Sequence, residues 1–518
     1  MDLWETYVAA FDAYKAKNFD TALELVDTIK KSAPDFKKIY MLEAWIYSEQ
    51  NDSLRAFLVL ERLVPQFDAW SPDEKPLLAQ SLNHMGLLCD RLALSEEALK
   101  FFHLAAKTYD DKNFALKSMS NVIYIANTLE NFSAEDFAAL YAEYKNFFAD
   151  VVPYPKKFYS HDKIRVGFVS SDFCGHPVMN WGLALVTGLD KNFFETHFYS
   201  ASHLADFITE KIRATADGWH DITDLTDAQA AELMRGDEID ILFDLNGHTK
   251  GNRLGAAMYR PATVQMSGIG YINSTGLDCF DYFLSDVHCA GDADFFVEKL
   301  IRLPHSHFCY TPLNVETIAP AAKDFVTFGC FNQFSKVTDT ILSAWAKILD
   351  AVPSSRLLLK HKIFDTENGR QFVSSRLGNL GIDISRVDMR GFTTNHLRDY
   401  NDVDIALDTF PYVGGVTTCE ALYMGVPVVS LYGSRHGTRF GLSMLKNIGL
   451  DELAVDNIDD YISRAVMLAS DRELLNILRK NLRGMMERSP LMDTTSYVHD
   501  VQEALIKILH EKKISRRD

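Results

Sequence analysis

The chain has 518 residues, of which 47% are hydrophobic and 24% are charged, and its formal net charge is −18. This length exceeds what one hydrophobic core supports, so two or three domains are expected, and the acidic balance argues against general binding to nucleic acids or anionic membranes. No apolar run could span a bilayer, the acidic start lacks the basic region of a signal peptide, and the seven cysteines form no CxxC pair. The sequence therefore predicts a soluble, cytoplasmic protein with reduced thiols.

Residues 1–150 have helical periodicity throughout and almost no strand pattern. Ala22 and Ala56 occupy similar settings 34 residues apart, which is the tetratricopeptide period. A further unit has Gly86 and Phe102 at the small and aromatic positions of such a repeat. We predict about three degenerate repeats, and a plain helical bundle is the alternative.

The repeat spacing slips at a proline-containing stretch over residues 65–76, and further helices are expected near 117–129 and 134–148. A helical layer with little chemistry of its own suggests that it docks a partner or braces the rest of the chain. A Pro/Lys linker over residues 152–157 ends this region.

Alternating strands and helices follow the linker. A first series of strands is expected at 163–171, 196–201, 239–246, 263–268 and 282–285, and a second at 325–331, 356–360, 387–390, 404–407 and 426–431. Two doubly wound parallel sheets are therefore predicted, in domains 151–320 and 321–518, with the final helix packing back. Such a pair places a ligand cleft at the carboxyl ends of the strands. No GxGxxG or P-loop pattern follows a first strand, which disfavours a dehydrogenase or a P-loop kinase.

Two polar clusters follow strands of the first series. Asp172 and His176 could accept a proton or orient a substrate hydroxyl, whereas the alternative is a turn-capping carboxylate beside a surface histidine. The second cluster, residues 246–250, contains His248 and Thr249. Because carboxyl ends of parallel strands meet at one edge, both clusters are expected to line the cleft.

Two more clusters follow strands of the second series. Gln333 and Lys336 could neutralise a diphosphate, although a lone lysine after a strand is more often simply solvated. The other cluster lies in residues 404–425, which read as a strand, a Gly-Gly turn and a helix. A helix N-terminus suits a phosphate, and the alternative is an ordinary capped strand-turn-helix.

The helix of that last cluster opens with Thr417 and Thr418, whose hydroxyls add donors for a phosphate. Glu420, one turn in, could accept both hydroxyls of a ribose, and His396 in a neighbouring loop could stack on a base.

Four segments carry a resemblance to a known family. They are RVGFVSSDFCGHP at 165–177, RPATVQMSGIGYINSTG at 260–276, FNQFSK at 331–336 and DIALDTFPYVGGVTTCEALYMG at 404–425. They resemble the motifs of the protein O-linked N-acetylglucosamine transferases and their plant SPINDLY-type relatives, which together form glycosyltransferase family 41. The resemblance runs from about residue 163 to residue 510. It implies an α/β GT-B fold, with two facing Rossmann-like domains, preceded by an all-α tetratricopeptide-like domain.

The resemblance also implies an activity, the inverting transfer of a sugar from a nucleotide diphosphate to a Ser or Thr hydroxyl of a polypeptide. Gln333 and Lys336 match family residues that bind the donor diphosphate, and Thr417 and Thr418 match the helix start that binds it. No metal is then required, since Lys336 and the helix start would stabilise the leaving group.

Other roles carried over by position concern the nucleoside and the acceptor. Glu420 matches the acidic residue on the ribose, and His396 matches the histidine at the base. Asp172 and His176 match the pair nearest the acceptor and the sugar, and either of them could take the proton. His248 and Thr249 are assigned to the acceptor and sugar side.

The chain departs from the animal transferases at several positions. Gly175 and Val178 replace an asparagine and a threonine around the His-Pro pair, Val416 replaces a histidine, and Thr393 replaces a lysine. A histidine that precedes the first strand in the family falls near Tyr144.

Donor and acceptor follow from the resemblance only in part. UDP-N-acetylglucosamine is the favoured donor because the residues on the sugar side keep that type's pattern. GDP-fucose is the alternative, because the chain from residue 331 resembles the SPINDLY type. By fold-level analogy the acceptor is a bacterial surface or flagellar protein.

Two other function classes compete with this interpretation. One is a non-catalytic helical-repeat scaffold with a GT-B-like half, which the intact polar clusters disfavour. The other is a nucleotide-sugar epimerase or a processive glycan synthase, which the helical front disfavours. The acceptor's identity and the oligomeric state stay open.

Overall fold

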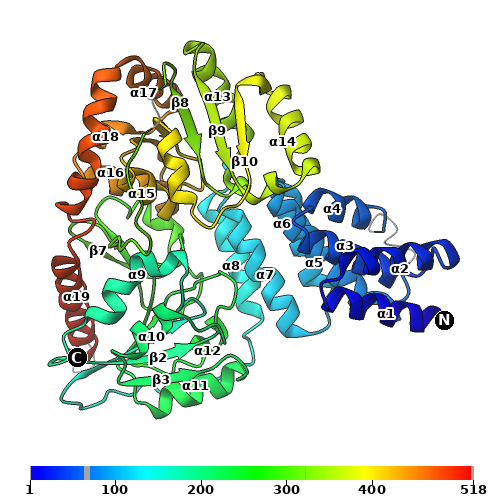
Figure 1. Ribbon diagram of the computed structural model, residues 1–518. Coiled ribbons are helices and arrows are strands. Elements are labelled where there is room, and N and C mark those ends of the chain that lie inside the picture. The colour runs from blue at the N-terminus through cyan, green and yellow to red at the C-terminus, as the bar shows by residue number, and fades with distance from the viewer. Residues whose placement is uncertain (1, 64–69, 321–322, 515–518) are drawn as a thin grey trace. The chain divides into compact units, whose positions relative to one another are not determined.

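The structure is a computed structural model, and it describes residues 2–63, 70–320 and 323–514. By its internal contacts the chain divides into two compact units, with elements labelled in Figure 1. Unit 1 holds residues 1–129 and 330–396, and unit 2 holds residues 130–329 and 397–518. The predicted domain boundaries at 150 and 320 are a different division of the chain and stay a prediction.

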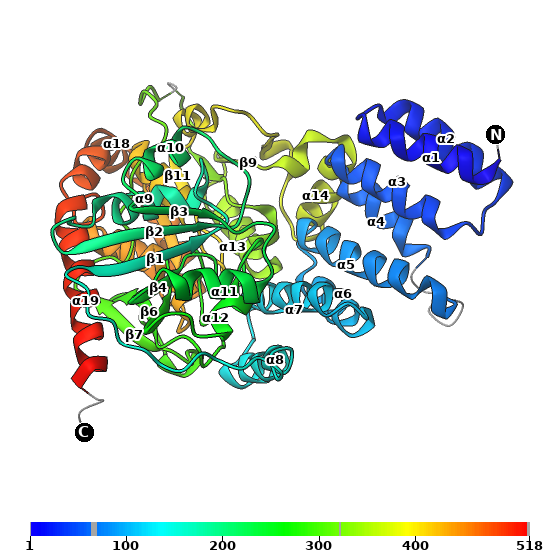
Figure 2. The same cartoon turned by 90° about the horizontal axis from the view of Figure 1, so that it is seen from below.

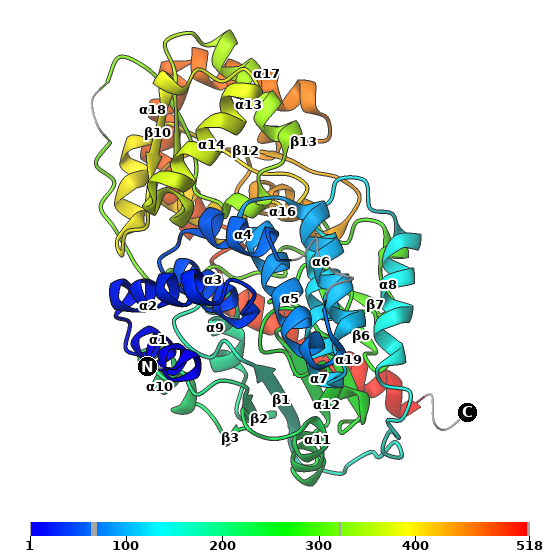
Figure 3. The same ribbon diagram turned by 90° about the vertical axis from the view of Figure 1, so that its right-hand side faces the viewer.

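The first part of unit 1 consists of antiparallel helical pairs (Figure 3). The pairs are α1 (Leu3–Lys15) with α2 (Phe19–Ser32), α3 (Lys37–Glu49) with α4 (Ser53–Glu61), and α5 (Lys75–Arg91) with α6 (Ser95–Thr108), and α7 (Lys112–Ala126) follows. Ala22, Ala56 and Ala98 are each the fourth residue of the second helix of a pair, and all three are fully buried. A small side chain is needed there because the paired helices approach closely. The predicted all-helical, tetratricopeptide-like region is confirmed.

Gly86 and Phe102 determine how the two helices of the third pair pack together. A Cβ added at Gly86 would lie 2.7 Å from the Phe102 ring, so the glycine allows the ring of α6 to pack directly on α5. Of the proline-containing stretch, Pro72–Glu74 forms a 3₁₀ turn, whereas residues 64–69 lie outside the described part of the chain.

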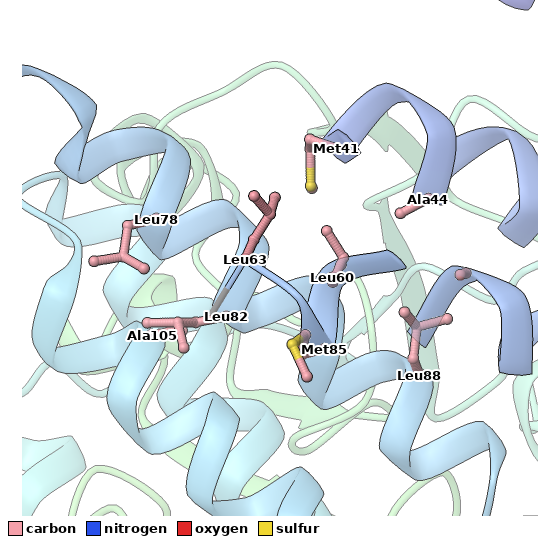
Figure 4. Close-up of a cluster of buried hydrophobic side chains, with 10 residues drawn as sticks. Met41, Ala44, Leu60, Leu63, Leu78, Leu82, Met85, Leu88 and Ala105 are labelled. Carbon is pink, nitrogen blue, oxygen red and sulfur yellow. The ribbon is translucent and has the colours of Figure 1, made fainter. Parts of the chain in front are cut away.

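Figure 4 shows the core that joins the second and third pairs. Leu60 of α4 and Leu82, Met85 and Leu88 of α5 are almost completely buried and belong to one apolar cluster with Met41 of α3. Burying side chains of this size stabilises by about 1.5–3 kcal/mol each, which explains why consecutive pairs stack into one body.

Unit 2 contains a seven-stranded parallel sheet in the order β3-β2-β1-β4-β5-β6-β7 (Figure 2). Its strands are β1 (Ile164–Ser170), β2 (Phe194–Ser200), β3 (Gly218–Asp221), β4 (Ile241–Asp244), β5 (Val264–Ser267), β6 (Tyr282–Asp286) and β7 (Lys299–Leu303). The accompanying helices are α8 (Ala134–Asn146), α9 (Pro177–Gly188), α10 (Phe207–Arg213), α11 (Asp227–Gly236) and α12 (Leu254–Met258). The chain order reverses between β1 and β4, which is the position where such sheets bind ligands.

The sequence did not predict β3 and β7, the two edge strands of this sheet. The residues of β3 are half-buried or exposed, and in β7 only Leu303 is buried. An edge strand has a neighbour on one side only, so it lacks the continuous apolar run by which the central strands were found.

The second sheet has the order β10-β9-β8-β11-β12-β13. Its strands are β8 (Thr327–Cys330), β9 (Arg356–Lys360), β10 (Val387–Arg390), β11 (Ile405–Leu407), β12 (Val428–Leu431) and β13 (Ala454–Val455), and the last of these was not predicted. Its helices are α13 (Asp339–Ala351), α14 (Glu367–Asn379), α15 (Val416–Tyr423), α16 (Phe440–Asn447), α17 (Ile458–Ser470) and α18 (Arg472–Glu487). Two parallel, Rossmann-like sheets behind a helical region confirm the predicted fold class.

The last helix, α19 (Thr494–Ile514), packs on α9, β5 and β7 of the first sheet. Gln502 accepts a hydrogen bond from the Asp190 amide at 2.6 Å, and Lys512 pairs with Asp281 at 2.7 Å. Within the described residues, no helix combines the length and the apolar character that crossing a membrane requires.

Candidate functional site

The loop after β1 carries Asp172 and His176. Asp172 accepts hydrogen bonds from Ser171 Oγ at 3.0 Å and from Asn246 Nδ2 at 3.1 Å, so both carboxylate oxygens are held. His176 caps α9, where its Nδ1 accepts from the Val178 amide at 3.4 Å, and this atom lies 3.7 Å from Asp172 Oδ2. Because Nδ1 accepts, the neutral ring carries its proton on Nε2. The pair is thus a fixed carboxylate beside an oriented imidazole, as general base chemistry requires.

Asn246, at the end of β4, joins the loops that follow β1 and β4. Its Oδ1 accepts from the Ser171 amide at 2.8 Å, while its Nδ2 donates to Asp172 and also to Thr249 Oγ1 at 3.0 Å. No role for Asn246 was predicted from the sequence. The signal that could have found it is its position, since β1 and β4 flank the reversal of strand order.

A buried carboxylate, Asp244, holds the loop after β4. Asp244 Oδ2 accepts from the Gly247 amide at 2.8 Å and from Ser267 Oγ at 2.7 Å. Burial raises the pKa of Asp244, although these hydrogen bonds favour the charged form. Gly247 has φ +52°, and a Cβ there would overlap Tyr271, so the turn requires glycine.

His248 and Thr249 lie in different surroundings. His248 is buried, with Nε2 2.9 Å from the Thr275 carbonyl oxygen and its ring edge-on to Tyr144 and Tyr271. Burial lowers the pKa of His248 to about 4, so the ring is neutral at pH 7. Thr249 is half-buried and shares the Asn246 network with Asp172. The structure therefore brings Thr249 to the Asp172 network and places His248 in the interior, and their predicted roles stay predictions.

The loop between β11 and α15 is held in the same way as the loop after β4. Asp408 Oδ1 accepts from the Thr409 and Gly414 amides at 2.9 and 2.6 Å, and Oδ2 accepts from Ser430 Oγ at 2.7 Å. The buried carboxylate thereby fixes the turn that leads into α15.

Thr417 and Thr418 turn their hydroxyls toward this loop. A Cβ added at Gly414 would lie 2.5 Å from Thr418 Oγ1 and 2.9 Å from Thr417 Oγ1, so the glycine leaves room for both. The Tyr400 hydroxyl also donates to the Thr417 carbonyl at 3.1 Å. The start of α15 is thus preorganised, with polar hydrogens suited to an anion.

Trp181 in α9 contacts the start of α15. A Cβ added at Gly415, the N-cap of α15, would overlap Cη2 of the Trp181 indole. His176 caps the helix that carries Trp181, about 7.5 Å of helix rise earlier. The two helix starts that carry the predicted acceptor and phosphate groups therefore belong to one packed arrangement inside unit 2.

The remaining predicted donor residues lie as follows. Glu420 is half-buried on α15, in unit 2. Gln333 is exposed and immediately precedes the 3₁₀ turn Phe334–Lys336, in which Lys336 is half-buried, and His396 is half-buried at the start of the 3₁₀ segment His396–Asp402. Gln333, Lys336 and His396 belong to unit 1. Their donor-binding roles stay predictions.

Residues 133–314 and 319–501 match the model of glycosyl transferase family 41. The chain belongs to this family. The family that the four sequence motifs predicted is thereby confirmed.

Relatives of this family 41 chain come from plants and bacteria. It is 38% identical over 379 residues to a probable UDP-N-acetylglucosamine–peptide N-acetylglucosaminyltransferase SPINDLY of Solanum lycopersicum, covering 71% of this chain and 40% of the relative. It is 30% identical over 366 residues to a probable UDP-N-acetylglucosamine–peptide N-acetylglucosaminyltransferase SEC of Arabidopsis thaliana, covering 67% of this chain and 37% of the relative. The chain thus spans well under half of the length of these relatives.

A solved structure matches this family 41 chain over nearly its whole length. It is a lysine-to-methionine mutant of the Thermobaculum terrenum O-GlcNAc transferase, with a TM-score of 0.87 and 28% identity, covering 99% of this chain and 98% of the other. The match includes the helical region as well as both α/β domains, and the GT-B prediction is confirmed.

Proposed function

We propose that this protein is an O-glycosyltransferase that moves a sugar from a nucleotide diphosphate to a Ser or Thr hydroxyl of a polypeptide, with inversion. The observation that carries the proposal is the packing of Trp181 on Gly415. It joins the helix capped by His176 to α15, which carries Thr417 in its first turn. The proposed acceptor-activating pair and the proposed anion-binding helix start would then share one site.

On the acceptor side, Asp172 is proposed to accept the proton of the attacking hydroxyl, directly or through one water. His176 would position the hydroxyl and the sugar, because its ring is oriented by the Val178 amide. The acceptor oxygen forms a bond to the anomeric carbon as the bond from that carbon to the diphosphate breaks. Asn246 supports this role because its amide donates to the same carboxylate.

On the donor side, the amides and hydroxyls at the start of α15 are proposed to bind the diphosphate. Lys336 and Gln333 would add a charge and an amide, so that the departing diphosphate is stabilised by protein groups without a metal. Glu420 would accept the ribose hydroxyls, and His396 would stack on the base.

UDP-N-acetylglucosamine is the proposed donor. The relatives named above are described as transferases for this sugar, and the segment from Asp172 to Pro177 resembles that type. GDP-fucose is the second candidate, because the chain from Phe331 onward resembles the SPINDLY type. Over the full aligned lengths, the SPINDLY relative is 38% identical and SEC is 30% identical. The proposed acceptor is a cytoplasmic polypeptide, by fold-level analogy a surface or flagellar protein before export.

A thermal-shift titration with UDP, GDP, UDP-N-acetylglucosamine and GDP-fucose tests the donor. At about 100 times the dissociation constant, a specific ligand stabilises the folded state by about 2.7 kcal/mol. Stabilisation by the uridine pair alone supports the proposal, and stabilisation by the guanosine pair alone moves it to fucosyl transfer.

Transfer itself is tested by incubating the stabilising nucleotide sugar with a Ser/Thr-containing peptide library and measuring added mass on peptide. A sugar found on peptide hydroxyls supports the proposal. Stabilisation by none of the four nucleotides, with no modified peptide, favours the scaffold, and product on free sugar alone favours a glycan synthase.

A further inference from the structure

A second group of polar side chains lies at the β3 edge of the first sheet. β2 and β3 lie side by side in the sheet and pair in parallel (Figure 2). In this register His197 is opposite Gly218, and Tyr199 is opposite His220. Side chains alternate along a strand, so His197, Tyr199 and His220 share one face of the sheet. Asp237, the residue after α11, reaches the same place, where its Oδ2 lies 3.0 Å from His220 Nε2.

Two imidazoles and one carboxylate therefore converge. One ligand atom from each of His197, His220 and Asp237 lies within 4.8 Å of the other two. Two ligand atoms that each lie about 2.1 Å from one tetrahedral ion are about 3.4 Å apart, and His220 Nε2 and Asp237 Oδ2 lie 3.0 Å apart.

His197 supplies an independent observation. Both of its ring nitrogens are buried and have no hydrogen-bond partner among the described residues. Buried ring nitrogens without a hydrogen-bond partner are unfavourable, and a bound ion would remove that penalty.

The surroundings hold the three side chains in place. A Cβ at Gly218 would lie 2.6 Å from His197 Nδ1, so the glycine makes room for the ring. The Tyr199 hydroxyl donates to Asp237 Oδ2 at 2.7 Å, and its ring stacks on His220 with centroids 5.3 Å apart. A hydrogen bond to a ligating carboxylate, as Tyr199 makes, is what orients metal ligands in proteins.

The positively charged side chain of Arg165 lies close to this group of residues. Arg165 donates to the Asp237 carbonyl oxygen at 3.1 Å, and it is paired with Glu195 at 2.9 Å. Because Glu195 offsets the guanidinium charge, the local charge does not oppose a divalent ion.

We propose that His197, His220 and Asp237 bind one divalent transition-metal ion, for which Zn²⁺ is the best match. Imidazole nitrogen with carboxylate oxygen is a ligand set that Zn²⁺ takes at about 2.0–2.2 Å, with further positions left to water. The ion would tie the edge strand β3 to β2 and to the end of α11. The site is separate from the proposed transfer chemistry, for which we propose no metal.

Equilibrium dialysis of the full-length, tag-free chain against micromolar ZnCl₂, with bound zinc measured by mass spectrometry, tests the site. The wild-type chain should bind one zinc ion. In His197→Ala and Asp237→Asn, the affinity for zinc should be at least about tenfold weaker than in the wild type. The matched control is His499→Ala, an exposed histidine of α19, which should bind like wild type.

Circular dichroism and gel filtration show whether each variant is folded. If His197→Ala does not fold, Asp237→Asn still tests the site. Tyr199→Phe should weaken binding less than either ligand variant, since it removes only the supporting hydroxyl. Zinc that stays bound with equal affinity in both ligand variants belongs elsewhere and overturns the proposal, as does a wild-type chain that binds none.

Discussion

Trp181 packs on Gly415 so closely that the glycine has no room for a side chain. The indole also contacts Phe308, with ring centroids 3.9 Å apart, so it cannot easily move aside. The start of α15, with its two threonines, is therefore positioned by a residue of the other α/β domain.

Replacing Gly415 should test this packing. Gly415→Ala is expected to destabilise the fold by about 1–3 kcal/mol, because the added methyl overpacks against Trp181, and to weaken nucleotide binding as the helix start shifts. Urea unfolding and a nucleotide titration measure the two effects. Gly236→Ala, where an added Cβ meets nothing within 4 Å, is the control and should be neutral or slightly stabilising. Equal behaviour of the two variants would contradict the packing argument.

Lys336→Ala should abolish transfer and leave the fold intact. Removing a cation that is proposed to stabilise the leaving diphosphate is expected to lower kcat by about 10²–10³. Turnover of the variant is compared with that of Lys347→Ala, which removes an exposed lysine of α13. Near wild-type turnover in Lys336→Ala would refute the role given to this lysine.

Asp172→Asn should separate catalysis from donor binding. The amide is isosteric but a poor base, so transfer should fall by about 10²–10⁴ while nucleotide affinity stays unchanged. Asn246→Ala should have a smaller effect in the same direction, because it removes one donor to the carboxylate. Asp162→Asn, at an exposed position, serves as the control. If Asp172→Asn keeps its activity, another group takes the proton.

The buried His248 should make stability depend on pH. Its folded pKa of about 4 lies below the unfolded value near 6.5, so the unfolded state binds the proton more readily. The stability is therefore fully present above pH 6.5 and is lost as pH falls toward 4, by on the order of 3 kcal/mol. His248→Gln, whose amide can still donate to the Thr275 carbonyl, should be less stable than the wild type at pH 7. Its free energy of unfolding should fall less than that of the wild type when the pH is lowered. Parallel urea curves at pH 7 and pH 5 measure this, and identical pH slopes in both proteins would exclude His248 as the cause.

Most of the fold could be predicted because its signals are local. The buried alanines at the same position of successive helices mark the repeats, and continuous apolar runs mark central strands such as β1 and β12. The strands that escaped prediction, β3, β7 and β13, are short or partly exposed, so their sequences lack that signal.

The candidate site could be predicted only in part. Polar residues after strands could be found because parallel strands bring their carboxyl ends together, which is how Asp172 and Thr249 were placed near each other. Asn246, which connects them, was missed because an asparagine after a strand is also an ordinary turn residue.

By itself, the sequence determined the helical repeats, the two parallel sheets and the family, since periodicity, burial runs and ordered motifs are properties of consecutive residues. Only the tertiary structure decided that the His248 ring is buried and neutral and that Trp181 packs on Gly415. It also decided that His197, His220 and Asp237 lie close together. Each of these depends on side chains from separate elements meeting in space, and packing in three dimensions sets which of them meet.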